Sequence, residues 1–290
     1  MARPTRLRAI AGVVAVAALL SAVAAAPSWL GHGVLHVSPP GPTLLFHPLE
    51  AGALPSATLL SAPALAQSPL LNGCEVTSLA MLFDYFGRPV SKMALAALAP
   101  RDPTPAVVTP ELGFHGNAIL AVTSWGNPEV GFVGSMTGAN GSLGYGMYHR
   151  PADELINMLW PGAALDLTGA PFSTIEEYVA AGIPVVLWTT YYFRPAPANE
   201  WVTWTSPEGT VRATPWEHAV LLVGYSSNTL WINNPGNGDT AEPVPLQPFL
   251  AAWNQLGDQA VTISPTALER IGWRFPYQVG ATLTAGLKPS

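Results

Sequence analysis

The chain has 290 residues, of which 49% are hydrophobic and only 10% are charged, whereas about 25% are charged in a typical soluble domain. This composition disfavours intrinsic disorder, which needs low hydrophobicity and high net charge. The net charge of -6 argues against nucleic-acid binding, which needs a dense basic surface. A single cysteine, Cys74, excludes an intrachain disulfide and a multi-cysteine zinc site.

The N-terminus has the pattern of an export signal. Arg3, Arg6 and Arg8 precede an uncharged run over residues 9–26, in which Ala22-Val23-Ala24 fits an A-x-A cleavage site. The length of this run is also close to the lower limit for spanning a bilayer. An uncleaved membrane anchor through residues 9–26 is therefore the main alternative, and a buried soluble helix is a third. We expect a secreted protein, or one held on the extracellular face of the membrane.

Composition divides the chain into four segments. Residues 1–26 form the predicted signal peptide or anchor. Residues 27–60 are rich in Pro, Gly and Ala and show no sustained period, which predicts a weakly structured linker or pro-like segment. Residues 61–264 are predicted to form one domain, and residues 265–290 a C-terminal tail.

The first strong element is a helix over residues 72–87, NGCEVTSLAMLFDYFG, because its apolar residues recur at helical spacing. Asn72 is expected to cap the helix, and Glu75 lies in the first turn, where an acidic side chain is favoured. Gly87 is a typical stop. The pattern therefore places Cys74 at the N-terminus of a helix.

The later elements predict an α+β fold, because helices come first and an antiparallel set of strands follows. The segment 101–148 is expected to be irregular, and Ser173 with Glu176 is expected to form a capping box. The predicted helices are 91–98, 153–159, 173–182 and 246–256, and the predicted strands are 185–193, a hairpin over 200–212, 218–225 and 229–233.

Cys74, His218 and Asn234 have the chemistry of a nucleophile, a base and an orienting group. The thiolate is the nucleophile in acyl transfer, and a helix N-terminus is expected to lower the pKa of Cys74 and to supply a backbone donor for an oxyanion. His218 begins a strand 144 residues after Cys74, and Asn234 ends the return strand 16 residues later. A hairpin would bring Asn234 beside His218, where its side-chain oxygen can hold the imidazole. Gln67, seven residues before Cys74, is a candidate oxyanion donor.

Each of these residues also has a purely structural explanation. Cys74 could be a packing residue, His218 a strand-end histidine, and Asn234 before Pro235 a turn residue, while Gln67 alone carries almost no signal. Their joint order and interval favour catalysis, because papain-type peptidases separate cysteine and histidine by about 130–150 residues. His32 and His36 have no carboxylate partner at metal-ligand spacing, and no P-loop, G-x-S-x-G or G-x-G-x-x-G occurs. The sequence therefore predicts no metal and no cofactor.

Several motifs resemble one known family over roughly residues 65–263. They are NGCEVTSLAMLFDYFG, GFVGSMTG with GYGMY, WEHAVLLVGYSSNTLWINNPGNG and, more weakly, FLAAWNQLGDQAVTI. In these the chain resembles the peptidase C-39-like family, papain-like cysteine peptidases related to the bacteriocin-processing double-glycine peptidases. Nothing resembles the membrane domain or ATPase of bacteriocin exporters, so leader processing coupled to export is not implied.

The resemblance implies a papain-like fold, in which an N-terminal helix carrying the cysteine packs on an antiparallel sheet carrying the histidine and asparagine. It implies that Cys74 is the nucleophile, His218 the general base and Gln67 the oxyanion glutamine. The family usually has Asp before Pro where this chain has Asn234-Pro235, a mild departure, because papain-like enzymes commonly use Asn there.

The leading functional hypothesis is an exported cysteine peptidase, or a related amide hydrolase, that forms an acyl-enzyme on Cys74. The alternatives are a catalytically weak papain-like domain that binds peptide or cell-wall material, and an acyl transferase that uses the same cysteine. Trp201, Trp204 and Trp216 are candidates either for the wall of a substrate groove or for the core. The expected partner is a peptide or protein substrate, with no nucleic acid, and the protein is expected to be a monomer.

Overall fold

The computed structural model describes residues 35–37, 54–112 and 118–275. The predicted signal peptide or anchor, most of the predicted linker 27–60 and the end of the predicted tail lie outside these residues. Within the described part of the chain, none of the helices combines the length and the apolar character that crossing a bilayer requires.

The described elements mix helices and strands, as the α+β prediction requires. The helices are α1 Cys74–Tyr85, α2 Lys92–Leu98, α3 His149–Leu159, α4 Phe172–Ala180, α5 Leu246–Gln255 and α6 Pro265–Arg270, with short 3-10 turns at Ala139–Gly141 and Ala198–Glu200. The strands are β1 Leu35–Val37, β2 Ala57–Leu60, β3 Arg101–Asp102, β4 Val107–Leu112, β5 Ala118–Ser124, β6 Phe132–Val133, β7 Ala164–Asp166, β8 Val185–Thr190, β9 Val202–Ser206, β10 Gly209–Ala213, β11 Glu217–Ser226, β12 Thr229–Asn234, β13 Asp239–Pro245 and β14 Ala260–Ile263.

Strand β11 is the centre of the main sheet. It pairs antiparallel with β8, β2 and β12, and the sheet continues as β1-β2-β11-β8-β14-β7, with β13 beyond β12. Apart from its two end residues, Glu217 and Ser226, β11 is buried along its whole length. A strand buried on both faces reads as a continuous apolar run rather than an alternating one, which is why HAVLLVGY is easy to recognise in the sequence.

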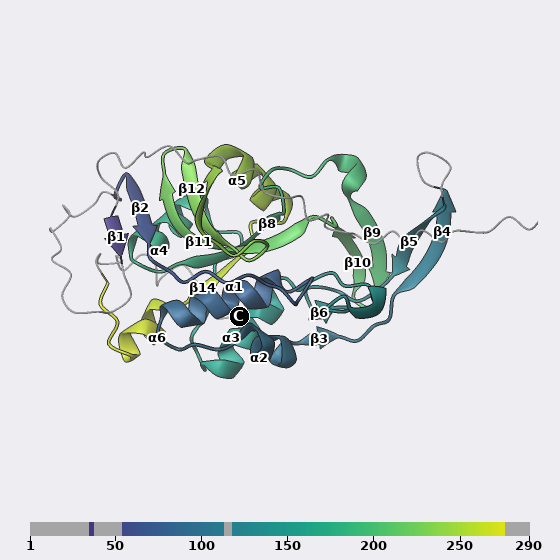
Figure 1. The fold of residues 1–290 in the computed structure, drawn as a ribbon, viewed down its shortest axis with the longest axis horizontal. Coiled ribbons are helices and arrows are strands. Elements are labelled where there is room, and N and C mark those ends of the chain that lie inside the picture. Colours follow the sequence, from purple (N-terminus) through teal and green to yellow (C-terminus); the bar gives the residue numbers. More distant parts are fainter. Residues whose placement is uncertain (1–34, 38–53, 113–117, 276–290) are drawn as a thin grey trace, which may run out of the picture.

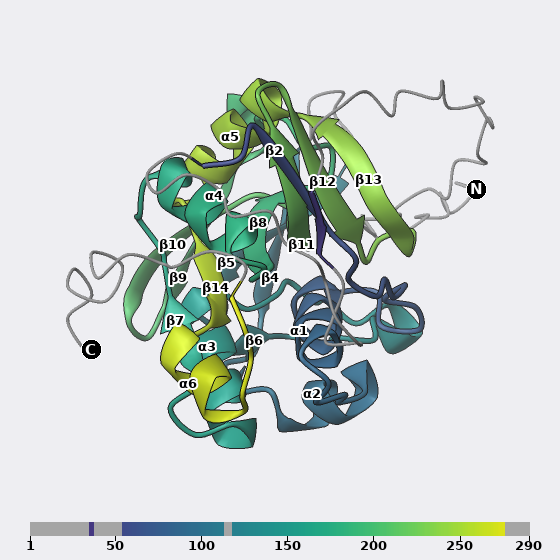
Figure 2. The same cartoon turned by 90° about the vertical axis from the view of Figure 1, so that its left-hand side faces the viewer.

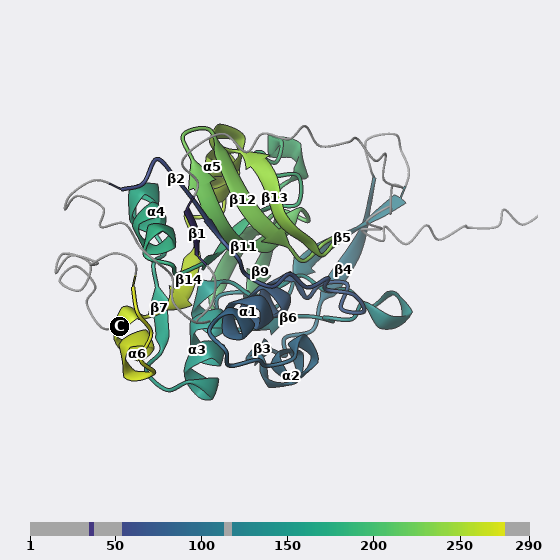
Figure 3. The same cartoon turned by 60° about the vertical axis from the view of Figure 1, so that its left-hand side comes forward.

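Helix α1 packs against this central strand, and all of its residues except Asp84 are buried. Figure 1 shows α1, α2 and α3 grouped on one side of the main sheet and α5 on the other. The turned views in Figures 2 and 3 show the same division. The core is one continuous apolar cluster between these layers, so the packing of α1 on β11 fixes where Cys74 lies.

A second, four-stranded sheet, in the order β10-β9-β5-β4, projects from the main body (Figure 1). The prediction that residues 101–148 are irregular is wrong here, because they contain β3, β4, β5 and β6. Pro110 obscured β4, but this is an edge strand, where a missing N–H is tolerated. The sheet has its own small core around Trp125 and Trp204, whose ring centroids lie 5.7 Å apart.

Strands β1 and β2 and helix α6 lie in the segments predicted to be linker and tail. β2 takes the last four residues of the predicted linker and pairs with Gly224 and its neighbours in β11. A Cβ on Gly224 would lie 2.5 Å from the carbonyl oxygen of Thr58, so this close approach of the backbones requires glycine. Helix α6 lies at the start of the predicted tail, with Ser264 as its N-cap.

Two predicted helix caps differ from those in the structure. The N-cap of α1 is Gly73 without a side-chain hydrogen bond, and Asn72 instead donates from Nδ2 to the carbonyl oxygen of Ser135 at 2.8 Å. The predicted Ser173–Glu176 box is also absent, because α4 starts one residue earlier, after Pro171. In both cases the tertiary fold, rather than local capping, sets where the helix begins. The end of α1 agrees with the sequence, because Gly87 has a φ of 69°.

The burial of α1 predicts a large effect from truncation in its core face. We expect Leu79→Ala to lower the free energy of unfolding by about 2–5 kcal/mol, because Leu79 is fully buried and a cavity would remain. Leu98→Ala is the matched control: Leu98 is 48% exposed, so its loss should cost about 0.5 kcal/mol or less. Urea unfolding of both variants measures the difference, and equal losses would contradict the described packing.

Candidate active site

The adjacent strands β11 and β12 bring His218 and Asn234 into contact. His218 Nε2 lies 2.9 Å from Asn234 Oδ1, and both side chains are buried. This is the juxtaposition that a hairpin over these residues predicts, because β11 and β12 are antiparallel neighbours joined by a short turn. Asn234 therefore holds one nitrogen of the imidazole in a fixed position.

The partners of Asn234 decide which way its amide points. Asn234 Oδ1 accepts the Gly236 N–H at 2.9 Å, and Asn234 Nδ2 donates to Glu242 Oε2 at 2.8 Å. A backbone N–H can only donate and a carboxylate can only accept, so the oxygen of the amide faces His218. His218 Nε2 must then carry the proton, and in the neutral ring Nδ1 is left as the proton acceptor.

His218 is held as a neutral base. It is 3% exposed, and the rings of Tyr191 and Phe193 lie beside it, with centroid distances of 5.3 and 6.4 Å. Burial lowers the pKa of His218 to about 4, against the opposing effect of its hydrogen bond to Asn234. At neutral pH the imidazole is therefore uncharged and able to accept a proton.

Cys74 is the first residue of α1 and is 5% exposed. Its helix is attached to β11 by a buried hydrogen bond, in which Ser78 Oγ donates to the Ala219 carbonyl oxygen at 3.1 Å. Burial, followed by the carboxylates of Glu75 and Glu217, raises the pKa of the Cys74 thiol well above its ordinary value. The prediction that the helix N-terminus lowers this pKa is therefore wrong, because desolvation and two nearby acids outweigh the helix dipole.

The acids beside Cys74 form a close pair, in which Glu75 is fully buried and Glu217 is half-buried. Glu75 is fully buried and accepts the Met147 N–H at 2.7 Å, while its Oε2 atom and Glu217 Oε1 are buried without a hydrogen-bond partner. Burial raises the pKa of both carboxyls. Cys74 Sγ and one oxygen from each acid lie within 4.8 Å of one another.

Gln67 is attached to the turn that follows Asn234. Its backbone N–H donates to the Pro235 carbonyl oxygen at 2.7 Å, and its side-chain Nε2 donates to the Leu71 carbonyl oxygen at 2.7 Å. The side-chain amide is thus engaged by its own segment. Gln67 lies in the same region as the histidine and asparagine, and its role at an oxyanion stays a prediction.

The four predicted residues converge on one region without all touching. His218 contacts Asn234, Gln67 contacts Pro235, and Cys74 lies beside the backbone of Ala219, the residue after His218. Among the described residues, no hydrogen bond joins the Cys74 thiol to the His218 ring. The catalytic roles of these residues therefore stay predictions.

Sequence reasoning missed three acids in this region, Glu75, Glu217 and Glu242. The first was interpreted as a helix-dipole residue, although it is fully buried. The only available signal was position: two of the acids directly adjoin Cys74 and His218 in the chain, and the third lies eight residues after Asn234.

The three candidate groove tryptophans do not form one wall. Trp204 is buried in the small core of the projecting sheet, Trp201 stacks on the guanidinium of Arg212 at 3.7 Å, and Trp216 packs against Tyr192. Of the three, Trp216 is the one that lies near His218, two residues before it in the chain.

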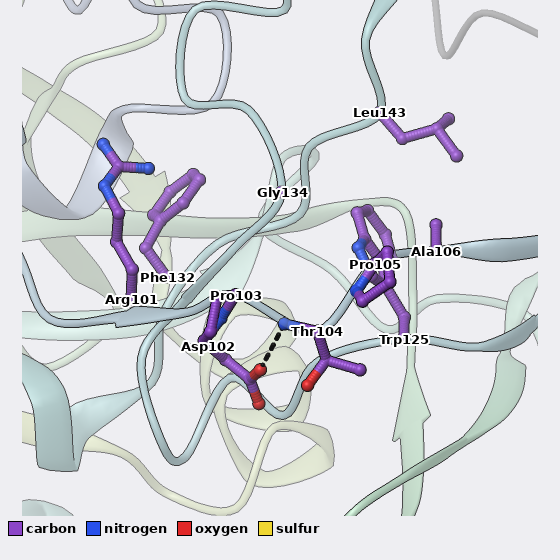
Figure 4. A pocket seen from close by; sticks show the side chains of 10 residues that line it. All are labelled: Arg101, Asp102, Pro103, Thr104, Pro105, Ala106, Trp125, Phe132, Gly134 and Leu143. Atoms are coloured by element: carbon purple, nitrogen blue, oxygen red, sulfur yellow. Dashed lines mark hydrogen bonds between the residues drawn. The ribbon is translucent and has the colours of Figure 1, made fainter.

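A cavity of about 390 Å³ lies apart from these residues (Figure 4). Cys74, His218 and Asn234 do not line it. Its acid, Asp102, accepts the N–H groups of Thr104 and Asn127 at 2.8 Å each, so the carboxylate is already satisfied. The carboxylate of the cavity is therefore not free for chemistry, and its other charged residue, Arg101, donates to the Ala96 carbonyl oxygen at 3.1 Å.

Comparison with known proteins defines first the class and then the family. The fold is that of a C39-like peptidase: the chain is similar to a crystal structure from Bacillus anthracis named as a C39-like peptidase, with a TM-score of 0.61 and 36% identity over 70% of this chain and 94% of that one. The family model "Peptidase_C39 like family" matches residues 59–261, and the chain belongs to this family. The uncharacterized protein YvpB of Bacillus subtilis (strain 168) is 37% identical over 194 residues, which are 67% of this chain and 70% of YvpB. The resemblance in the sequence motifs and the α+β papain-like fold prediction are thereby confirmed.

The lowered pKa of His218 predicts a pH dependence of stability. The unfolded chain, with an ordinary histidine pKa of 6.5, binds this proton before the folded protein does at about 4, so His218 removes stability as the pH falls through this window. We expect the parent to lose about 2 kcal/mol more than His218→Gln between pH 7 and pH 5. Urea unfolding at both pH values measures this difference, and equal losses would show that the imidazole is not buried as described.

The orientation of Asn234 predicts a role for Glu242. Glu242→Gln keeps an acceptor for Asn234 Nδ2, whereas Glu242→Ala removes it and lets the amide turn over. We expect nitrogen NMR to find the proton on His218 Nε2 in the parent and in Glu242→Gln, and a mixture of tautomers in Glu242→Ala. Asp239→Ala is the control, because that carboxylate accepts from Asn237. An unchanged tautomer in Glu242→Ala would contradict this role.

Proposed function

We propose that this protein is a cysteine peptidase, or a closely related amide hydrolase, that forms an acyl-enzyme on Cys74. The single observation that carries the proposal is the chain of hydrogen bonds from Glu242 through Asn234 to His218. It leaves Nδ1 of a neutral imidazole as the acceptor, which is the state required of a general base. Membership of the C39-like family supports the same class of reaction.

In the proposed reaction, His218 Nδ1 takes the proton of the Cys74 thiol as Sγ attacks the carbonyl carbon of the scissile amide. The carbonyl electron pair moves to oxygen, where backbone N–H groups at the start of α1 and the Gln67 amide are the candidate donors. Collapse breaks the C–N bond, and the imidazolium returns its proton to the leaving amine. Water then attacks the thioester with His218 again as base, which releases the acid and regenerates the thiol.

The pKa values of the free protein favour a resting pair of neutral thiol and neutral imidazole. The thiol pKa is raised and the imidazole pKa is lowered, both mainly by burial. An ion pair is therefore disfavoured before substrate binds, and we propose that proton transfer accompanies the attack. This makes the reaction resemble hydroxyl-based catalysis more than attack by a preformed thiolate.

A binding domain with little or no activity is the second candidate. The observation that favours it is the same raised pKa of a buried thiol, together with the lack of a hydrogen bond between Cys74 and His218. In that case the domain would bind peptide or cell-wall material without turning it over. The predicted export signal or anchor over residues 1–26 supports a location outside the cytoplasm for either candidate.

Turnover of a mixed fluorogenic peptide library by the full chain tests the proposal. We expect Cys74→Ala to abolish hydrolysis and His218→Ala to lower kcat/KM by about 10²–10⁴-fold, which is the usual contribution of a general base. Leu98→Ala, on an exposed helix position, is the control and should leave the rate unchanged.

Three outcomes separate the candidates. Loss of turnover on alkylation of Cys74 supports the enzyme, whereas binding that survives alkylation in a protein without turnover supports the binding domain. If an added amine is incorporated into the product more readily than water, the acyl-enzyme is used for transfer.

A further inference from the structure

The pair of acids beside the nucleophile has no part in the reaction described above. Glu75 directly follows Cys74 on α1, and Glu217 directly precedes His218 on β11. The two carboxyl groups thus face each other across the same boundary between helix and sheet that separates the predicted nucleophile from its base. One oxygen of each acid lies within 4.8 Å of the other and of Cys74 Sγ, so the pair spans that boundary beside the predicted nucleophile.

Both carboxyl groups lie close to the backbone of Gly146. A Cβ on Gly146 would lie 2.3 Å from Glu75 Oε1 and 2.9 Å from Glu217 Oε2, so the backbone at this glycine lies directly against both acids. Glu75 Oε1 is engaged by the Met147 N–H, which leaves Glu75 Oε2 and Glu217 Oε1 as the buried oxygens without a partner.

No positive charge compensates the pair. Among the described residues, the ion pairs are those of His149 with Glu129 and Asp166, and no Lys, Arg or His lies within bonding distance of Glu75 or Glu217. The other titratable groups that face the pair are the Cys74 thiol from α1 and the phenols of Tyr145 and Tyr148, which donate to or accept from each other at 2.8 Å.

Two carboxylates in such a place are not both ionised near neutral pH, because each would place an uncompensated charge next to the other. A proton held between them gives each unpartnered oxygen a hydrogen-bond partner and leaves one negative charge in place of two. We propose that Glu75 and Glu217 share one proton through these oxygens, and that this carboxyl–carboxylate bond is a positioning element that ties Cys74 to the start of β11 and keeps its thiol protonated in the resting protein.

This proposal rests on the proposed function only in naming Cys74 as the nucleophile. The shared proton acts in two ways. It attaches the first turn of α1 to β11 beside His218. The one negative charge that remains on the pair of carboxyl groups opposes ionisation of Cys74. Loss of that proton would add a second charge and suppress the thiolate further, so the pair limits the reactivity of Cys74 on the alkaline side.

The rate of alkylation of Cys74 by iodoacetamide, measured in the full chain from acidic to alkaline pH, tests the proposal without a substrate. Glu217→Gln removes the second negative charge that loss of the shared proton would create, and it keeps a donor, because the new amide can donate to Glu75 Oε2. We expect the thiol pKa to fall by about one unit, so that alkylation at alkaline pH is up to about tenfold faster, with the thermal midpoint within a few degrees of the parent.

Glu176→Gln is the matched control, because burial also raises the pKa of Glu176, but it lies on α4 and does not contribute to the pKa of Cys74. Its alkylation profile should coincide with that of the parent. A Glu217→Gln profile that also coincides with the parent overturns the proposal. So does an increase in the parent's alkylation rate on adding EDTA, because a bound cation would then occupy the place given to the proton.

Infrared spectroscopy of the parent keeps the proposal testable if Glu217→Gln does not fold. A carbonyl stretch of a protonated carboxylic acid should persist at pH 7, and its absence would overturn the shared proton. Failure of the proposed function gives a different result: the parent would then turn over no peptide, while Glu217→Gln would still shift the alkylation profile.

Discussion

The packing of the first turn of α1 against the start of β11 is the constraint on which the site depends. It brings together residues 144 positions apart, and the buried hydrogen bond from Ser78 to the Ala219 carbonyl fixes the contact. The same burial raises the pKa of Cys74 and lowers that of His218. The contact that builds the site therefore also restrains its reactivity, because both ionised forms lose water when the two layers close.

Asn234 lies between the His218 ring and the carboxylate of Glu242, so the negative charge of Glu242 acts on the ring through an intervening amide. An aspartate, which the sequence resemblance leads us to expect there, would place a negative charge directly beside the imidazole. In this chain a neutral amide receives the imidazole N–H and passes its own N–H to Glu242. The orienting function is retained, while the electrostatic support for an imidazolium is weaker because the carboxylate is separated from the ring by an amide. This agrees with the low pKa of His218.

Sequence patterns were sufficient where structure is set locally. The helix beginning at Cys74 and the hairpin of β11 and β12 follow from apolar period and turn residues, and they locate His218 beside Asn234. Sequence patterns were insufficient where strands far apart in the chain pair. β5 pairs with β9 through Ser124 and Thr205, and no local pattern around either residue predicts this pairing. The acids around Cys74 were misread for a related reason. Burial depends on how the layers assemble, which the local sequence does not show. Glu75 would suit the first turn of an exposed helix, but in the assembled protein α1 is covered and burial raises the pKa of this carboxyl.

Strand β2 has a consequence for the integrity of the central sheet. It pairs with β11 at Ser226, Tyr225 and Gly224, where β8 has already ended. A chain shortened to begin after Leu60 would leave this stretch of β11 with unpaired N–H and C=O groups along one edge. Such an edge is a template for pairing with a strand from another molecule. These four residues therefore cover that edge of β11 and keep it from pairing with a strand of another chain.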